Sequence, residues 1–187
     1  MMLFTCDVES DFGGRDNSIR GIEVGVPKIL ELFKAYKIKA IFFLSTKKLL
    51  HYLPIARMIL GEGHTLGSHG HEHLNWKNRS WIEWWDDYKI SQKLLKDYLD
   101  VSVDFNLYRA PWFSKNNHMI YDTPLNHVSV LKHSWFGGKI PKDPIFYIHP
   151  FDIVKAPKTA SNLFCKVLYS RPEKVFETFH ELIQKFS

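Results

Sequence analysis

The sequence predicts one α/β domain in which short strands alternate with longer helices. Its 187 residues are an ordinary length for a single domain, and 45% hydrophobic with 24% charged residues is a globular composition. Segments of strand length alternate along the chain with segments of helical periodicity. This alternation predicts a mainly parallel sheet with helices packed outside it, either open or closed as a barrel. Active sites in such folds lie at the carboxyl ends of the strands.

The first half of the chain contains the clearest alternation, with strands that are short and apolar. The predicted elements, in order, are a strand at residues 3–8, a helix at 22–36, a strand at 40–44, a helix at 47–60 and a strand at 65–68. Pro54 should break or kink the second of these helices, because proline has no backbone N–H to donate.

The second half begins with the longest predicted helix, residues 79–99, for which Ser80 is a candidate cap. Period-two alternation of apolar residues then predicts a fourth strand at residues 101–109. The remaining predicted elements are a loop at residues 110–126, strands at 127–131 and 145–149, and an amphipathic helix at 172–186.

Composition and charge exclude several classes of function. The net charge of +5 is scattered along the chain, which argues against a nucleic-acid-binding surface. No apolar run approaches the roughly 20 residues of a transmembrane helix. Cys6 and Cys165 are too few for a disulfide framework. The first eight residues lead directly into a strand without the features of a secretory signal, so we expect a cytoplasmic protein.

Two carboxylates, Asp7 and Glu9, stand at the end of the first predicted strand. Residues two apart on a strand point to the same side, roughly 6 to 7 Å apart, so both can face one cleft. A divalent cation held by one would relieve their repulsion and leave the other as a general base. A solvated acidic strand end is the alternative interpretation.

Three histidines follow the third predicted strand, at positions 69, 71 and 73. On one helical turn, His69 and His73 would lie about 5 to 6 Å apart at Cβ and could close on one zinc ion. His71 projects differently and is expected to make a supporting contact. A chance cluster on an exposed turn is the alternative.

Arg109 ends the fourth predicted strand and His149 the last one. Arg109 can pair bidentately with a carboxylate such as that of Asp7. His149 can titrate near neutral pH and so protonate a leaving amine. Trp112 and Phe113 could form a wall against a sugar ring or cap the core. Together these groups have the layout of a hydrolase with one metal ion, a base and an acid.

These residues resemble the motifs of the polysaccharide deacetylase family, which is also called the NodB homology domain or carbohydrate esterase family 4. The four matching segments occur in the family's order and lie at residues 5–9, 68–73, 109–112 and 148–150. The resemblance covers essentially the whole chain. It implies a distorted (β/α) barrel of about six to seven strands, here shortened or open after the fourth strand.

The resemblance also implies roles for individual residues in metal-dependent removal of N-acetyl, sometimes O-acetyl, groups from glycans. Glu9, His69 and His73 would hold one divalent metal ion, most simply zinc, with cobalt, nickel or manganese as alternatives. Asp7 would be the base, Arg109 its partner and His149 the general acid.

Three departures from the family pattern are evident. Glu9 stands where aspartate is commoner, the stretch from Arg109 to His149 is short, and the acid that should orient His149 is not identified. Residues 121–123 only faintly resemble the family's Tyr-Asp-Ser.

Three functions remain open from the sequence. The first is a deacetylase acting on an N-acetylated sugar, which is a hydrolase of non-peptide carbon–nitrogen bonds. The second is a hydrolase of a cyclic amide on the same scaffold, and the third is a catalytically silent glycan-binding domain.

Overall fold

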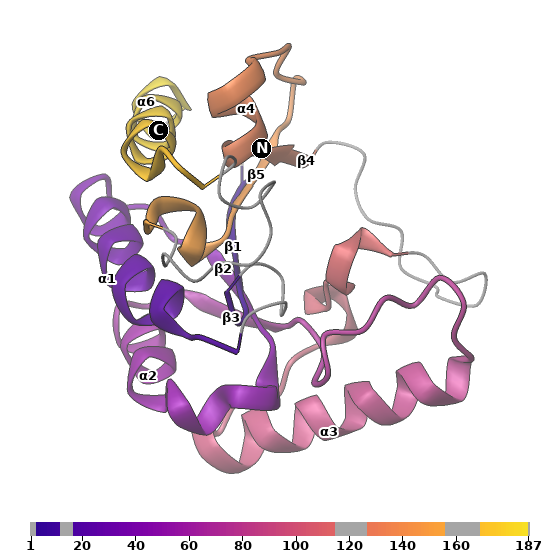
Figure 1. Ribbon diagram of the computed structural model, residues 1–187. Coiled ribbons are helices and arrows are strands. Elements are labelled where there is room, and N and C mark those ends of the chain that lie inside the picture. Colours follow the sequence, from indigo (N-terminus) through magenta and orange to yellow (C-terminus); the bar gives the residue numbers. More distant parts are fainter. Residues whose placement is uncertain (1–2, 12–16, 115–126, 156–168, 187) are drawn as a thin grey trace.

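A parallel β-sheet forms the centre of the molecule (Figure 1). The computed structural model describes residues 3–11, 17–114, 127–155 and 169–186. The five strands in these ranges have the order β3-β2-β1-β5-β4. They are β1 (Leu3–Val8), β2 (Ile41–Leu44), β3 (Thr65–Ser68), β4 (His127–Ser129) and β5 (Ile145–Ile148). The α/β class is confirmed, and the sheet is open, with fewer strands among the described residues than the six or seven expected.

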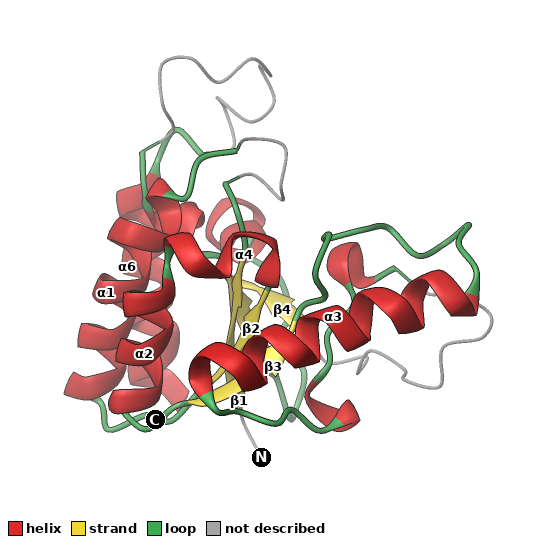
Figure 2. Ribbon diagram, turned by 90° about the horizontal axis from the view of Figure 1, so that it is seen from below, coloured by secondary structure: helices red, strands yellow, loops and turns green. Residues whose placement is uncertain are grey.

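Helices cover the sheet unevenly. Three of them, α1 (Arg20–Ala35), α2 (Leu53–Gly61) and α6 (Pro172–Phe186), lie on one side of the sheet (Figure 2). The longest, α3 (Trp81–Leu99), runs past the β3 edge, and the short α4 (Val130–Phe136) packs against α6. Every helix in the described part of the chain is too short or too polar to span a membrane.

The side chains of β1 point alternately to the hydrophobic core and to the opposite face of the sheet. Phe4, Cys6 and Val8 belong to the main hydrophobic core, where Phe4 stacks on Phe146 with ring centroids 5.3 Å apart. Successive strand side chains point to opposite faces. Asp7 therefore points away from that core although it is itself buried.

The predicted helix at residues 47–60 is divided, as Pro54 indicated. A 3-10 helix, η1 (Thr46–His51), precedes α2, and Pro54 stands in the first turn of α2. A proline there loses no helical hydrogen bond, because the first N–H groups of a helix have no partner within it.

Ser80 caps α3 as predicted from the sequence. Its hydroxyl accepts from the Glu83 N–H, and the Glu83 carboxylate accepts from the Ser80 N–H, which completes a capping box.

The strand predicted at residues 101–109 is wrong. Its only pairing among the described residues is a single parallel bridge between Ser68 and Tyr108, and a 3-10 turn, η2 (Phe105–Leu107), interrupts it. The Gln92 side chain of α3 bonds both the N–H and the carbonyl of Val103. The backbone groups of Val103 are therefore taken by a side chain instead of a neighbouring strand.

The strand predicted at residues 127–131 ends two residues early. The Ser129 hydroxyl accepts from the Lys132 N–H and caps α4, so the chain turns into a helix at Val130.

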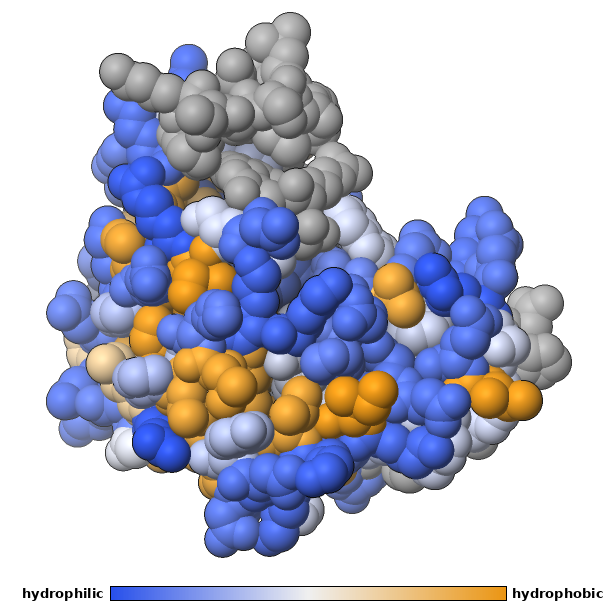
Figure 3. Space-filling view, turned by 60° about the horizontal axis from the view of Figure 1, so that its bottom comes forward, coloured by the Kyte–Doolittle hydropathy of each residue, from blue (hydrophilic) through white to orange (hydrophobic). Residues whose placement is uncertain are grey.

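Large apolar side chains on the surface form several groups. On the face shown in Figure 3 they gather in several groups bordered by polar side chains. The most exposed among the described residues are Phe136, Ile82 and Leu50.

The Gly25→Ala variant is expected to lose about 1–3 kcal/mol of unfolding free energy through overpacking. A Cβ on Gly25 of α1 would overlap the carbonyl oxygen of Pro150 in η4 (Pro150–Ile153). Gly61→Ala is the control, because a Cβ there meets nothing within 4 Å, and its effect should stay within about 0.5 kcal/mol. Urea denaturation of both variants measures this. Equal stabilities would mean that α1 and η4 are not closely packed.

Candidate metal centre and catalytic site

The carboxyl ends of the parallel strands bring the sequence-predicted site residues together. Asp7 and Glu9 lie at the end of β1, His69 and His73 follow β3, and His149 follows β5. Arg109 reaches the same edge because its N–H bonds the carbonyl of Ser68 at the end of β3.

Glu9, His69 and His73 form a cluster of three potential metal ligands. One donor atom from each lies within 4.8 Å of the other two. Nε2 of His69 is 3.1 Å from Oε2 of Glu9, and Nε2 of His73 is in close contact with the same oxygen. The longer glutamate side chain is therefore accommodated where the family more often has aspartate.

Hydrogen bonding shows that this cluster fits a cation. Nδ1 of His69 lies 2.8 Å from the carbonyl oxygen of Arg109, which can only accept, so Nδ1 carries the proton. In the neutral ring, the lone pair of Nε2 then faces the Glu9 carboxylate. Nε2 of His73 is buried without a hydrogen bond of acceptable geometry. Two imidazole nitrogens and a carboxylate around one point are the kind of donors that a divalent metal ion requires.

The loop that carries the two histidines is held by Asp87 of α3. Its buried carboxylate accepts from the N–H groups of His71 and Glu72, each at 2.8 Å. His73 has φ of 55°, which is unusual for a residue other than glycine. His71 lies outside the cluster, and its Nδ1 is 3.1 Å from the Thr46 hydroxyl, a supporting contact.

Asp7 and Arg109 form a buried ion pair beside the cluster. Nη1 of Arg109 donates to Oδ1 of Asp7 at 2.5 Å, and Arg109 and Asp7 are 5% and 2% exposed. Nη2 of Arg109 lies 3.2 Å from Nε2 of His127, which must accept because a guanidinium only donates. The guanidinium also lies over the Phe43 ring, 4.2 Å from its centroid. Asp7 is therefore held in one orientation.

His149 faces the carboxylates of Asp7 and Glu9. Its Nε2 is 4.0 Å from Oδ2 of Asp7 and 3.8 Å from Oε1 of Glu9. Oδ2 of Asp152 lies 3.2 Å from Nδ1 of His149 and accepts from the His149 backbone N–H at 2.8 Å. Asp152 is therefore the acid that orients His149, and it directs Nε2 into the site.

Neighbouring charged and polar groups shift the pKa values of Glu9 and His149. Burial favours the neutral form of Glu9, but His69, His73 and His149 outweigh it and hold its pKa well below the ordinary value. Burial likewise lowers the pKa of His149, but the carboxylates of Asp152, Glu9 and Asp7 raise it to about 9. A bound cation would act in the opposite direction on His149.

Trp112 and Phe113 have different surroundings. Trp112 is 47% exposed, and its ring centroid is 5.5 Å from that of His73. Phe113 is half-buried, with its ring 4.9 Å from that of His127 and near the Arg109 guanidinium. Trp112 is thus available to a ligand, whereas Phe113 packs against the Arg109 network.

Sequence reasoning did not assign Asp152 or His127 to the site. An acid three residues after His149 is the spacing of a capping interaction, which could have indicated Asp152. His127 stands on an edge strand with no local signal. Residues 121–123 and Cys165 lie outside the described part of the chain.

The chain is similar to known proteins in sequence and in fold. The family model described as "Polysaccharide deacetylase" matches residues 16–125. The peptidoglycan deacetylase of Helicobacter pylori is 31% identical over 112 residues, which are 57% of this chain and 38% of that protein. The chain therefore spans well under half of this curated relative.

Two solved structures are similar in fold. One is a pseudoenzyme of carbohydrate esterase family 4 from Bacillus anthracis, with a TM-score of 0.69 and 20% identity over 100% of this chain and 61% of that one. The other is a family 4 acetyl xylan esterase from Clostridium thermocellum in complex with a cobalt ion, with a TM-score of 0.63 and 14% identity over 99% and 84%. Since the family model matches more than half of its residues, this chain belongs to the polysaccharide deacetylase family.

Proposed function

We propose that this protein is a metal-dependent hydrolase that removes N-acetyl groups from a sugar of a glycan or glycan precursor. The observation that carries the proposal is the convergence of Glu9, His69 and His73, which lie beside an Asp7–Arg109 pair and a His149–Asp152 pair. The similarity to a peptidoglycan deacetylase supports an N-acetylated carbohydrate as the substrate.

Two imidazole nitrogens and one carboxylate oxygen are a ligand set typical of catalytic zinc. Cobalt, nickel or manganese would accept the same ligands, and the esterase of similar fold was solved with cobalt. Held by these residues, such an ion would supply Lewis-acid chemistry for the acetyl carbonyl and for a water molecule.

Asp7 is the general base in this proposal. Its Oδ1 is engaged by Arg109, so Oδ2, which faces His149, is the oxygen that can take a proton from the attacking water. Arg109 and His127 do not touch the substrate in this scheme. They hold the Asp7 carboxylate in place.

His149 is the general acid. Asp152 bonds its Nδ1, which leaves the Nε2 proton to be given to the departing amine. Trp112 is exposed beside His73 and offers an aromatic face to the sugar ring.

The metal site is tested by the metal content of variants. His69→Ala and His73→Ala should each lose most of the bound zinc, because two ligands from protein seldom retain a catalytic ion. His71→Ala is the matched control from the same loop and should keep its metal. Undiminished zinc in both ligand variants would contradict the proposed site.

The Asp87→Ala variant keeps all three metal ligands, but its affinity for the metal should fall by about 10-fold or more. This is the usual effect of removing a group that orients ligands. Asp87 anchors the loop between the two histidines. Asp86→Ala is the control, because Asp86 is exposed and pairs with Lys89. Competition with a chelator measures both, and equal affinities would show that the loop needs no anchor.

The choice of substrate distinguishes the proposed deacetylase from a hydrolase of cyclic amides. A panel of N-acetylated sugars and cyclic amides should give acetate release from the sugars and no ring opening. The opposite pattern would assign the second function considered from the sequence.

A further inference from the structure

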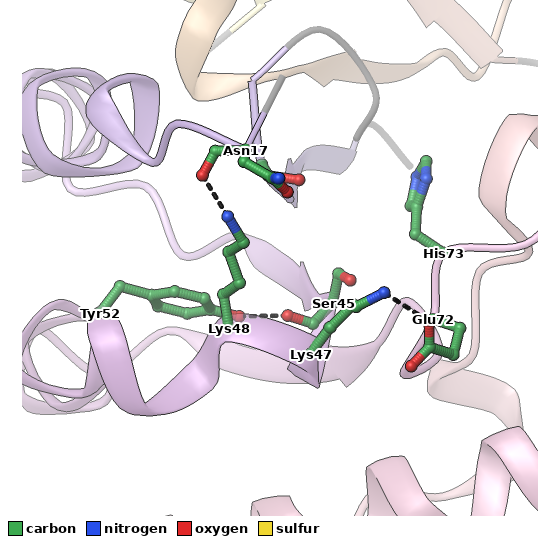
Figure 4. A pocket seen from close by; sticks show the side chains of 8 residues that line it. Asn17, Ser45, Lys47, Lys48, Tyr52, Glu72 and His73 are labelled. Atoms are coloured by element: carbon green, nitrogen blue, oxygen red, sulfur yellow. Dashed lines mark hydrogen bonds and ion pairs between the residues drawn. The ribbon is translucent and has the colours of Figure 1, made fainter. Parts of the chain in front are cut away.

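A polar pocket lies next to the candidate metal centre (Figure 4). It has a volume of about 100 Å³, room for a small charged substituent. Its lining residues come from the segments that follow β1, β2 and β3, including η1, and they are Ser10, Asn17, Ser45, Lys47, Lys48, Tyr52, Glu72 and His73. His73 therefore borders both this pocket and the metal cluster, and Ser10 directly follows Glu9.

The pocket has an excess of positive charge. It contains two lysines and one glutamate, and Lys47 is paired with Glu72, with Nζ 2.6 Å from Oε2. Nζ of Lys48 instead donates to the backbone carbonyl of Asn17, which is neutral. In Figure 4 the two lysine side chains diverge from the turn after β2, toward Asn17 and toward Glu72. Among the described residues, no carboxylate forms an ion pair with Lys48.

We propose that this pocket binds an anionic substituent of the substrate, with Lys48 as the residue that recognises it. The inference rests on the proposed function, because it places the acetamido group at the metal cluster. Because His73 borders both places, we place the anion on the same sugar as the acetamido group, at a carbon near the one that bears it. A carboxylate on an ether substituent at one neighbouring carbon, or a phosphate at the other, meets this requirement.

Lys48 is better suited to this role than Lys47. An anion that reaches Lys48 replaces a neutral carbonyl with a charged acceptor, which forms the stronger hydrogen bond. An anion at Lys47 would have to compete with Glu72. Ser10 also lines the pocket, and a serine hydroxyl can donate a further hydrogen bond.

The test compares charged and neutral substrates on the Lys48→Met variant. N-acetylmuramic acid and its methyl ester form one pair, and N-acetylglucosamine 1-phosphate and N-acetylglucosamine form the other. Wild-type protein should show a KM about 10-fold lower for at least one anion than for its neutral partner, the scale of one hydrogen bond to a charged group. Whichever pair shows the difference identifies carboxylate or phosphate as the source.

Lys48→Met should raise KM for that anion about 10-fold and leave kcat and the neutral substrate unchanged. Lys48→Arg should restore the preference, and Lys28→Met, on the exposed face of α1, should retain wild-type values. Equal changes for charged and neutral substrates, or none, would overturn the inference.

A binding measurement tests the pocket independently of the proposed deacetylase activity. If the wild type hydrolyses no substrate in the panel, calorimetric titration with N-acetylmuramic acid and N-acetylglucosamine 1-phosphate still examines the pocket. Binding of one of them that weakens about 10-fold in Lys48→Met supports the pocket, while undetectable binding or unchanged affinity contradicts it.

Discussion

The Asp7→Asn variant should retain its metal and its fold while its deacetylase activity falls by about 10² or more, the scale of losing a general base. Asparagine has nearly the shape of aspartate, and its carbonyl oxygen can still accept from Arg109 in place of Oδ1. The amide group that replaces Oδ2 cannot take a proton from water. The expected loss is therefore in kcat, with the fold and the zinc content retained.

Glu9→Gln is the matched comparison, since it is also a change from carboxylate to amide on the same strand end. It should lose metal along with activity, because Glu9 contributes a ligand oxygen. Metal analysis and kinetics on the two variants separate the roles. If Asp7→Asn remains active and only Glu9→Gln fails, Asp7 is not the base.

The His149→Ala variant should lose about 10² or more in the hydrolysis of an N-acetyl sugar, and much less with an activated aryl acetate. An amine leaves readily only after protonation, whereas a phenolate leaves without an acid. Nε2 of His149 lies beside the carboxylates of Asp7 and Glu9, where the amine would depart. Comparison of kcat for the two substrates on this one variant measures the effect.

Asp152→Asn should give the same selectivity with a smaller loss, because Asp152 acts through the orientation of His149. Zinc content should be unchanged in both variants. Equal losses on both substrates, or loss of zinc, would mean that His149 only supports the site.

The sequence predicted the strands that carry the site because they are short segments that alternate with segments of helical periodicity. β1 and β3 have the predicted bounds, and parallel pairing of β1 with β2 and of β2 with β3 aligns their carboxyl ends. The residues that follow these strands therefore had to meet, which is why the Glu9, His69 and His73 cluster could be expected.

Tertiary contacts account for what the sequence did not predict. The alternation at residues 101–109 is that of a strand, but Gln92 of α3 takes the backbone groups of Val103. His127 joins Arg109 only after β4 pairs with β5. Both contacts join residues that are separated in the sequence, and no local sequence pattern indicates them.

The polar pocket beside His73 is a further example. Lys47 and Lys48 follow an apolar strand, where lysines are usual in a solvated turn. Only the folded chain brings them together with Ser10, Asn17 and Glu72.

Acetate release by reconstituted protein tests the central claim most directly. The protein is stripped with a chelator and then assayed on N-acetylglucosamine-containing oligosaccharides, first without metal and then with one equivalent of zinc or cobalt. We expect no acetate from the stripped protein and restored release after reconstitution, with none from reconstituted His69→Ala. Full activity without metal, or zinc bound at Glu9, His69 and His73 without deacetylation of any N-acetylated sugar, would contradict a metal-dependent deacetylase.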